Sequence, residues 1–118
     1  MLAAADGSRI AGFATFGDFR AWPGYRFTVE GTVHIHSDSR GKGVGTELLK
    51  AILAHARRLE KHVMIAGVDS ENVASLRFLE RFGFERAGRL REVGYKFDRF
   101  LDLVFLQYWI TPPKKGPA

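Results

Sequence analysis

The sequence predicts an α/β (α+β) domain in which a mixed sheet carries a helix on each face. Two segments, residues 44–60 and 73–82, place apolar residues at the spacing of one helix face. The other apolar segments are short and bounded by Gly, Pro or Asp, which is typical of strands. The resulting order is β-β-β-α-β-α-β-β, and a sheet with a helix on each face satisfies it.

Composition indicates one globular domain. The chain has 118 residues, of which 46% are hydrophobic and ten are Phe, enough to bury a core. It has no cysteine, which excludes disulfide frameworks and thiolate metal sites. No apolar run reaches membrane-spanning length, and the start, Met1-Leu2-Ala3, lacks the basic region and hydrophobic core of a secretory signal. We therefore expect a cytoplasmic protein without a membrane partner.

The net charge of +5 favours an anionic partner. A nucleic acid, a membrane surface or a phosphate-bearing cofactor would fit that charge. The basic residues are spread along the chain apart from the Lys114-Lys115 pair. The sequence has no zinc-ligand spacing, no aromatic RNA-recognition string and no helix-turn-helix pattern, so we expect no nucleic-acid partner. Because of the positive charge, a basic nucleic-acid-binding domain remains the less favoured alternative function.

The N-terminal third is predicted to form three strands. Asp6-Gly7 is the strongest short hairpin signal, and Pro23-Gly24 marks a turn in a longer loop. Gly31 interrupts the third strand, which indicates a bulge or a close backbone approach. The predicted strands are residues 2–5, 10–16 and 26–35.

The rest of the chain alternates helices and strands. The apolar run after His62 is continuous, as in a strand buried on both faces. Residues 69–72 offer several N-cap side chains, Gly83 ends the second helix, and Gly94 is expected to join the last two strands. We predict helices at 44–60 and 73–82, strands at 62–68, 84–93 and 100–110, one domain at 1–110, and a flexible tail at 111–118.

Three glycines, Gly41, Gly43 and Gly45, lie between a predicted strand and a helix start. Glycine allows close backbone approach to a ligand, and the first N–H groups of a helix attract anions. Arg40 and Lys42 add positive charge. The pattern indicates a phosphate or pyrophosphate site, the alternative being a tight turn with solvated basic residues. The Walker and dinucleotide-binding glycine patterns do not fit this spacing.

The pattern Arg40-x-x-Gly43-x-Gly45 resembles the acetyl-CoA pyrophosphate loop of the GNAT acetyltransferase superfamily. Further segments look like its phosphinothricin and methionine sulfoximine N-acetyltransferase branch, so the resemblance covers residues 2–108. They are His62–Gly67, Glu71–Ser75, Phe82-Gly83-Phe84, Gly94–Phe97 and Leu101-Asp102-Leu103. The resemblance implies a mostly antiparallel sheet and direct transfer of an acetyl group from acetyl-CoA to the amino group of a small amino acid or analogue.

The resemblance also implies which residues bind the cofactor. The loop Arg40–Thr46 would hold the pyrophosphate. Backbone N–H groups of Val33, His34 and Ile35 would stabilise the oxyanion, in a region where the family's strands splay apart. Asn72 and Ser75 would hold the pantetheine arm, although helix capping is a strong alternative for both. The implied set is Val33, His34, Ile35, Arg40, Gly41, Lys42, Gly43, Val44, Gly45, Thr46, Asn72 and Ser75.

Glu30 is the candidate general base. It lies in the strand that enters the glycine loop, and a carboxylate there can take a proton directly or through a water molecule. The alternative is a solvated or salt-bridged strand residue. In the resembling family, a Glu at this place of the motif Thr-x-Glu-x-Thr/Ser-Val is the base.

The resemblance leaves the acid that protonates the leaving thiolate unassigned. Leu79 stands where many family members have Tyr or His, and Phe97 stands where His is frequent, as in the methionine sulfoximine branch. Water, Tyr95 and Tyr108 are the remaining candidates for the acid that protonates the thiolate.

The loop at residues 20–25 is the candidate substrate-binding segment. Arg20 can pair with a substrate carboxylate, and Trp22 and Tyr25 can enclose a small side chain. A solvated Arg and a core-anchoring Trp are the alternatives. The predicted residues are Arg20, Trp22, Pro23, Gly24 and Tyr25. We predict no metal site, because His34 and His36 share a strand face without a third ligand.

The resembling family begins with a strand and two helices, but Met1 stands here where its second strand starts. We expect either a shortened chain or a homodimer in which a second copy covers the open sheet. A GNAT-like module that binds CoA without catalysis is the alternative to an active enzyme.

Overall fold

The computed structural model describes residues 2–6, 9–35 and 43–114, and its elements follow the predicted order. Most boundaries lie within about two residues of the predicted ones, and the helix at 73–82 coincides with its prediction. The elements are β1 (Leu2–Asp6), β2 (Arg9–Asp18), the 3-10 helix η1 (Pro23–Tyr25), β3 (Thr28–Ile35), α1 (Val44–Arg58), β4 (Val63–Asp69), α2 (Val73–Phe82), β5 (Glu85–Lys96) and β6 (Arg99–Trp109).

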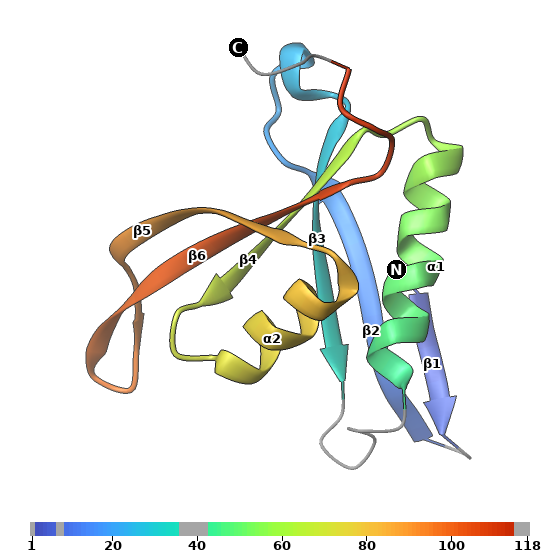
Figure 1. Ribbon diagram of the computed structural model, residues 1–118. Helices are drawn as coiled ribbons and strands as arrows, with labels where there is room; N and C mark the ends of the chain where they lie inside the picture. Colours follow the sequence, from blue (N-terminus) through green and yellow to red (C-terminus); the bar gives the residue numbers. More distant parts are fainter. Residues whose placement is uncertain (1, 7–8, 36–42, 115–118) are drawn as a thin grey trace.

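One sheet contains the six described strands in the order β1-β2-β3-β4-β6-β5. The β3–β4 pair is parallel and the other described pairs are antiparallel, which confirms a mixed, mostly antiparallel sheet. Helix α1 is the crossover between the two parallel strands, as a parallel pair requires. The hairpin of β5 and β6 extends to one side of the body (Figure 1).

Both helices pack on the same face of the sheet, which we call the helix face. In the pairing registers, the helix-face residues of β2, β3, β4 and β6 include Phe16, Val29, Met64 and Tyr108. Phe16 stacks near His55 of α1, and Tyr108 near Phe82 of α2.

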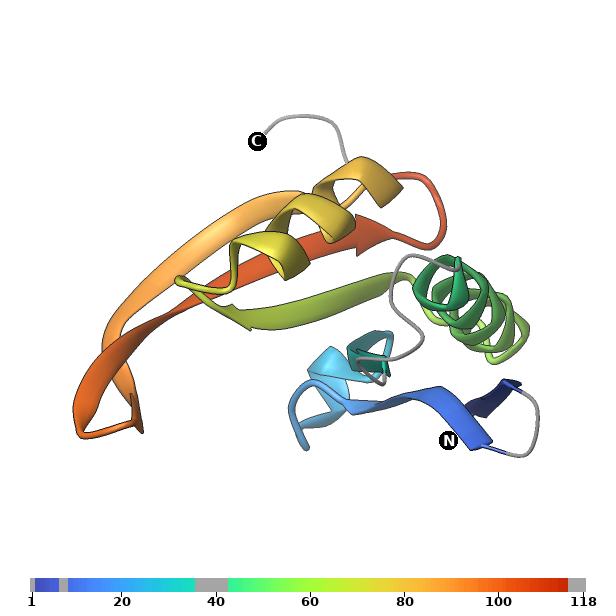
Figure 2. The same ribbon diagram turned by 90° about the horizontal axis from the view of Figure 1, so that it is seen from below.

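The prediction of a helix on each face of the sheet is therefore wrong for the described chain. The second face of the sheet, which we call the open face, has no described helix over it (Figure 2). The amphipathic patterns predict that each helix covers a sheet but not which side it covers. On the open face, Glu30, Thr32 and Gly67 are exposed, and Ile65, Leu103 and Phe105 are half-buried.

The core lies between the two helices and the helix face. Its largest fully buried side chains are Val29, Leu49, Ile52, Met64 and Leu106. The buried stripe of α1 is the one that the sequence predicts. In α2, Leu76 and Leu79 are buried, whereas Val73, at the same apolar spacing in the first turn, is 49% exposed.

The turn between β5 and β6 differs from the prediction. Gly94 lies inside β5 opposite Leu101, next to a register irregularity, and the turn itself is Phe97-Asp98. Both turn residues have left-handed backbones, with φ of 53° and 59°. That conformation suits a two-residue hairpin but favours Asn-Gly or Asp-Gly, so Asp98 alone was a weaker turn signal than Gly94.

Hydrogen bonds to His62 reach Thr111, one residue past the predicted domain end at residue 110. His62 accepts hydrogen bonds at its carbonyl from the N–H groups of Ile110 and Thr111, and its ring contacts the Thr111 hydroxyl. Residues 112–114 are exposed, and the rest of the predicted tail lies outside the described residues. Among the helices of the described chain, none is long and apolar enough to cross a membrane.

Candidate active site

The parallel strands β3 and β4 pair over only three positions and then separate. Thr28, Val29 and Glu30 pair with Val63, Met64 and Ile65, respectively. Beyond that point β3 pairs with β2 and β4 pairs with β6, but the two strands no longer pair with each other. Their facing backbone N–H and C=O groups are left for a ligand or water, because unpaired polar backbone is costly to bury.

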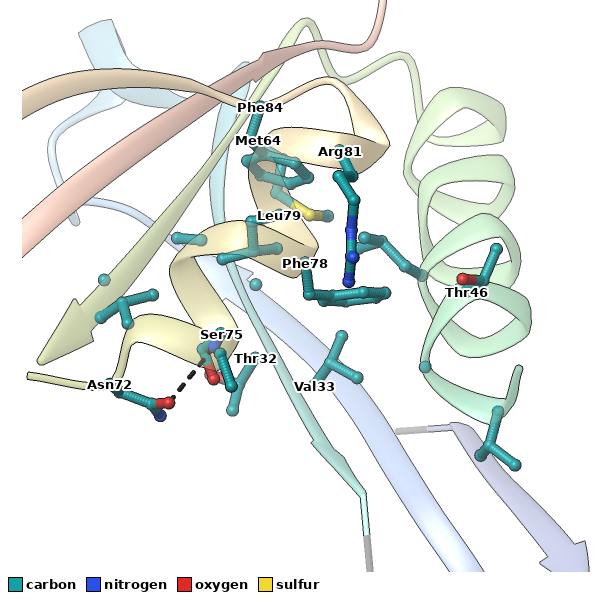
Figure 3. A pocket seen from close by; sticks show the side chains of 18 of the residues that line it. Thr32, Val33, Thr46, Met64, Asn72, Ser75, Phe78, Leu79, Arg81 and Phe84 are labelled. Atoms are coloured by element: carbon teal, nitrogen blue, oxygen red, sulfur yellow. Dashed lines mark hydrogen bonds between the residues drawn. The ribbon is translucent and has the colours of Figure 1, made fainter. Parts of the chain in front are cut away.

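A cleft of about 600 Å³ opens on the helix face over this gap, a volume in the usual range for small-molecule sites. The start of α1, the gap strands and one side of α2 form its walls (Figure 3). Of the predicted cofactor residues, it brings together Val33, Gly43, Val44, Gly45, Thr46, Asn72 and Ser75.

The start of α1 presents backbone N–H groups to the cleft. Gly43 precedes the helix with φ of 78°, a conformation that glycine adopts without steric cost, and among the described residues no side chain caps this end. Backbone N–H groups and the helix dipole at the start of a helix favour an anion. Arg40, Gly41 and Lys42 lie outside the described residues, and His34 and Ile35 continue β3 opposite Phe13 and Gly12.

The start of α2 forms the opposite wall. The Asn72 side-chain oxygen accepts a hydrogen bond from the Ser75 N–H at 3.2 Å, so the capping role is present. Asn72 and Ser75 also line the cleft. The Asn72 side-chain NH₂ remains a donor, so capping does not prevent contact with a ligand.

Two cleft residues, Phe78 and Arg81, were missed by the sequence prediction. Both side chains point from α2 towards the start of α1 (Figure 3). Asn72, Ser75, Phe78 and Arg81 are three residues apart, so this spacing along one helix side could have found them. The Arg81 guanidinium has no hydrogen bond or ion pair to the described residues and is a free cation beside the cleft.

Glu30 lies on the other side of the gap. Its side chain is on the open face, exposed and without a hydrogen bond or ion pair among the described residues. Its Oε2 atom is 3.6 Å from where a Cβ on Gly67 would be, and Gly67 itself lines the cleft. The carboxylate is therefore adjacent to the opening between the strands rather than inside the cleft.

Comparisons with known proteins agree with this arrangement. The profile of the acetyltransferase (GNAT) family matches residues 1–84. The chain is 42% identical over 118 residues to an L-methionine sulfoximine/L-methionine sulfone acetyltransferase of Pseudomonas paraeruginosa, covering 99% of this chain and 69% of that protein. This chain belongs to the GNAT acetyltransferase family. Members of this family are acyltransferases, and acetyl-CoA is the co-substrate.

Two further relatives extend this result. An L-amino acid N-acyltransferase of Escherichia coli is 43% identical over 107 residues, which cover 91% of this chain and 62% of that protein. A Salmonella typhimurium acetyltransferase structure, solved with acetyl-CoA, superposes with a TM-score of 0.89 at 40% identity, covering 98% of this chain and 67% of that one. The chain thus spans about two thirds of the length of the relatives named here.

The predicted substrate loop lies apart from the cleft of this GNAT chain. Trp22 is 64% exposed, and the Arg20 guanidinium lies over the Tyr25 ring at 5.0 Å. Helix η1 lies near the first residues of β3, whereas α1 starts beyond the last residues of β3, at the other end of the strand (Figure 1). The loop nevertheless begins close to Glu30, because Gly17 pairs with Glu30 and the Phe19 N–H donates to the Thr28 carbonyl.

The tyrosines considered as acids do not line the cleft. Tyr108 packs against Phe82 and Phe84 with ring centroids 5.7 and 5.2 Å away, beside a neighbouring recess. Tyr95 is 63% exposed near the tip of the β5–β6 hairpin. Leu79 is at the cleft wall, where it offers no proton.

The β5–β6 hairpin supports the turn that carries Asn72. The Asp102 carbonyl accepts from the Ser70 N–H at 3.0 Å, and Arg99 pairs with Glu71. The Asp102 carboxylate accepts from the Glu92 N–H at 2.9 Å and pairs with Arg89. These two donors, the backbone N–H first, hold the pKa of Asp102 below its ordinary value.

Proposed function

We propose that the chain transfers an acetyl group from acetyl-CoA to the amino group of a small amino acid or analogue. Acceptors of the methionine sulfoximine, methionine sulfone or phosphinothricin type fit best. The observation that carries this proposal is the gap between β3 and β4, which joins the helix-face cleft to Glu30 on the open face. The names of relatives from Pseudomonas, Salmonella and Alcaligenes faecalis support the acceptor class.

The cleft residues fit the parts of acetyl-CoA. The α1 start from Gly43 to Thr46 faces the pyrophosphate, with Arg81 as a cation from the opposite wall and Arg40 and Lys42 as further candidates. The unpaired backbone edges of β3 and β4 suit the amides of the pantetheine arm, and the Asn72 amide adds a donor. Acetyl-CoA supplies the activated thioester.

Glu30 takes the proton that the acceptor ammonium group must lose before its nitrogen can attack the thioester carbonyl. Those backbone N–H groups of the Val33–Ile35 stretch that face the gap donate to the carbonyl oxygen as it gains negative charge. The N–C bond then forms as the C–S bond breaks, and CoA leaves as the thiol. We assign its proton to water, because Leu79 offers none and Tyr95 and Tyr108 lie outside the cleft.

The loop at residues 20–25 recognises the acceptor carboxylate. Thr28 shares the open face with Glu30, and the loop begins beside Thr28. A substrate whose ammonium group meets Glu30 extends its carboxylate towards Arg20, while the exposed Trp22 and Tyr25 provide apolar contact. Pro23 and Gly24 form the short η1 turn that orients these side chains.

The protein forms a homodimer. β1 and β5 are edge strands in the described sheet, and the backbone groups along their outer edges can pair with a second copy of the chain. Sedimentation at micromolar concentration is expected to give a dimer, and a monomer alone would contradict this.

The decisive experiment combines binding and turnover. Acetyl-CoA is titrated into the protein by calorimetry, and CoA release is then measured with a panel of amino acids that includes L-methionine sulfone and phosphinothricin. Binding with acceptor-dependent thiol release supports the enzyme. Binding without release for any acceptor would indicate a CoA-binding module, and no acetyl-CoA binding would contradict the proposal.

A further inference from the structure

Gly67 is where the cleft on the helix face meets the Glu30 carboxylate on the open face. It lines the cleft, yet a Cβ on it would point to the open face. The nearest atoms there would be Leu103 Cδ1 at 3.3 Å, Glu30 Oε2 at 3.6 Å and Phe105 Cε1 at 3.6 Å. The absent side chain therefore leaves a recess bounded by one carboxylate and two apolar side chains.

The two sides of Glu30 are not equivalent. On the β2 side, the ladder with β3 is continuous through Glu30, which pairs with Gly17. On the β4 side, the ladder stops at the pair of Glu30 and Ile65. An acetyl group held in the cleft can therefore meet an amine beside Glu30 only across the β4 side, and the recess over Gly67 is on that side.

We propose that Gly67 determines the size of the acceptor, because the acceptor's α-carbon and side chain occupy the recess over Gly67. This inference rests on the proposed acetyltransferase function and adds what limits the size of its acceptor. Leu103 and Phe105 are half-buried and offer apolar contact, so the recess suits the methylene groups of the acceptor side chain. The permitted bulk of the acceptor near its α-carbon then depends on the hydrogen at Gly67.

Substitution at Gly67 tests this with a matched control. Gly67→Ala adds a methyl group whose tight neighbour is the flexible end of Leu103, so we expect the fold to persist. Gly17→Ala adds the same group on the same face across from Glu30, where no atom lies within 4 Å of the new Cβ. Thermal melting and acetyl-CoA titration should match the unmodified protein for both variants.

The expected result concerns the acceptor. Gly67→Ala should lower kcat/KM for L-methionine sulfone by about tenfold or more, the scale of one misfitting methyl group in a pocket. Gly67→Val should lower it further, and the loss should shrink for the shorter acceptor L-2-aminobutyrate. Gly17→Ala should stay within about threefold of the unmodified protein, below the effect of one methyl group. Calorimetric titration of L-methionine sulfone into the complex with CoA should show weaker binding for Gly67→Ala.

The outcomes separate this inference from the proposed function. If the unmodified protein releases no thiol with any acceptor, the acetyltransferase proposal fails and this one with it. If the unmodified protein is active and Gly67→Ala keeps its kcat/KM and acceptor affinity, only the Gly67 inference is overturned. An equal loss in Gly17→Ala would overturn it too, because the effect would not be specific to the β4 side.

Discussion

On the helix face, Val29, Met64 and Leu106 are at most 1% exposed, whereas Glu30 and Gly67 on the open face of the same strands are exposed. The two sets alternate along the chain, since side chains of a strand point to opposite faces. Burying Val29 therefore obliges Glu30 to face the other way, and a slip of one residue would exchange them. The difference shows how packing on one face positions a reactive group on the other.

The largest expected effect is on stability, and it is tested by replacing one isoleucine in the core and one on the open face. Ile52 is 1% exposed in the core, and Ile52→Ala should destabilise the protein by about 2–5 kcal/mol, through lost burial and the cavity left behind. Ile65 is half-buried on the open face, and Ile65→Ala should cost only about 1 kcal/mol. Chemical denaturation of both variants measures the difference. Equal losses would show that the open face is covered in solution.

The second prediction concerns the chemistry of the open face. Glu30→Gln keeps the shape of the side chain but cannot accept a proton, so kcat should fall about 100-fold or more with acetyl-CoA affinity unchanged. Raising the pH should partly rescue the variant, because the neutral amine then forms without a base. If KM for the acceptor rises and kcat stays the same, Glu30 binds the ammonium group and does not act as the base.

The third prediction addresses the cofactor end of the helix face. Gly43 has φ of 78°, which strains a β-branched residue although the space around it is open. In free Gly43→Val this surface segment should relax, so melting should change little. Acetyl-CoA binding must restore the strained backbone and should weaken at least tenfold, on the order of the strain cost of such a backbone. Gly88→Ala is a control, since no atom lies within 4 Å of its new Cβ. Unchanged affinity in folded Gly43→Val would remove this loop from the site.

Sequence periodicity predicted the helix face better than the open face. The stripe of α1 and the cap at Asn72 are local patterns, and both are present. The face on which α2 packs depends on long-range pairing of β4 with β6, which no local pattern contains. The turn at Phe97-Asp98 was missed for the same reason: the pairing of β5 with β6 decides it, and Asp98 without a following Gly is only a weak hairpin signal.

The residues of the candidate site likewise divide into those that the sequence indicated and those that only the structure brings together. The glycine pattern pointed to the cleft through its place at a helix start, whereas Asn72 was assigned through the family resemblance, with helix capping as the alternative. Phe78 and Arg81 lie on a side of α2 to which the sequence analysis assigned no role. The proximity of Gly67 to Glu30 depends on the register of two strands far apart in the chain, and therefore required the structure.

The smallest effect concerns the hairpin that supports the Asn72 turn. The pKa of Asp102 is held below its ordinary value of 3.8 by the Glu92 N–H and Arg89. The ionised form is favoured by folding, so this stabilisation is complete above about pH 4 and is lost as the pH falls through the lowered pKa. Asp102→Asn should therefore melt slightly below the unmodified protein at pH 7, and the difference should narrow below pH 3.8. Asp18→Asn, which removes an exposed carboxylate at the end of β2, is the control for the loss of one negative charge elsewhere in the chain. A melting difference for Asp102→Asn that persists unchanged to pH 2 would mean that the charge of Asp102 contributes nothing to hairpin stability.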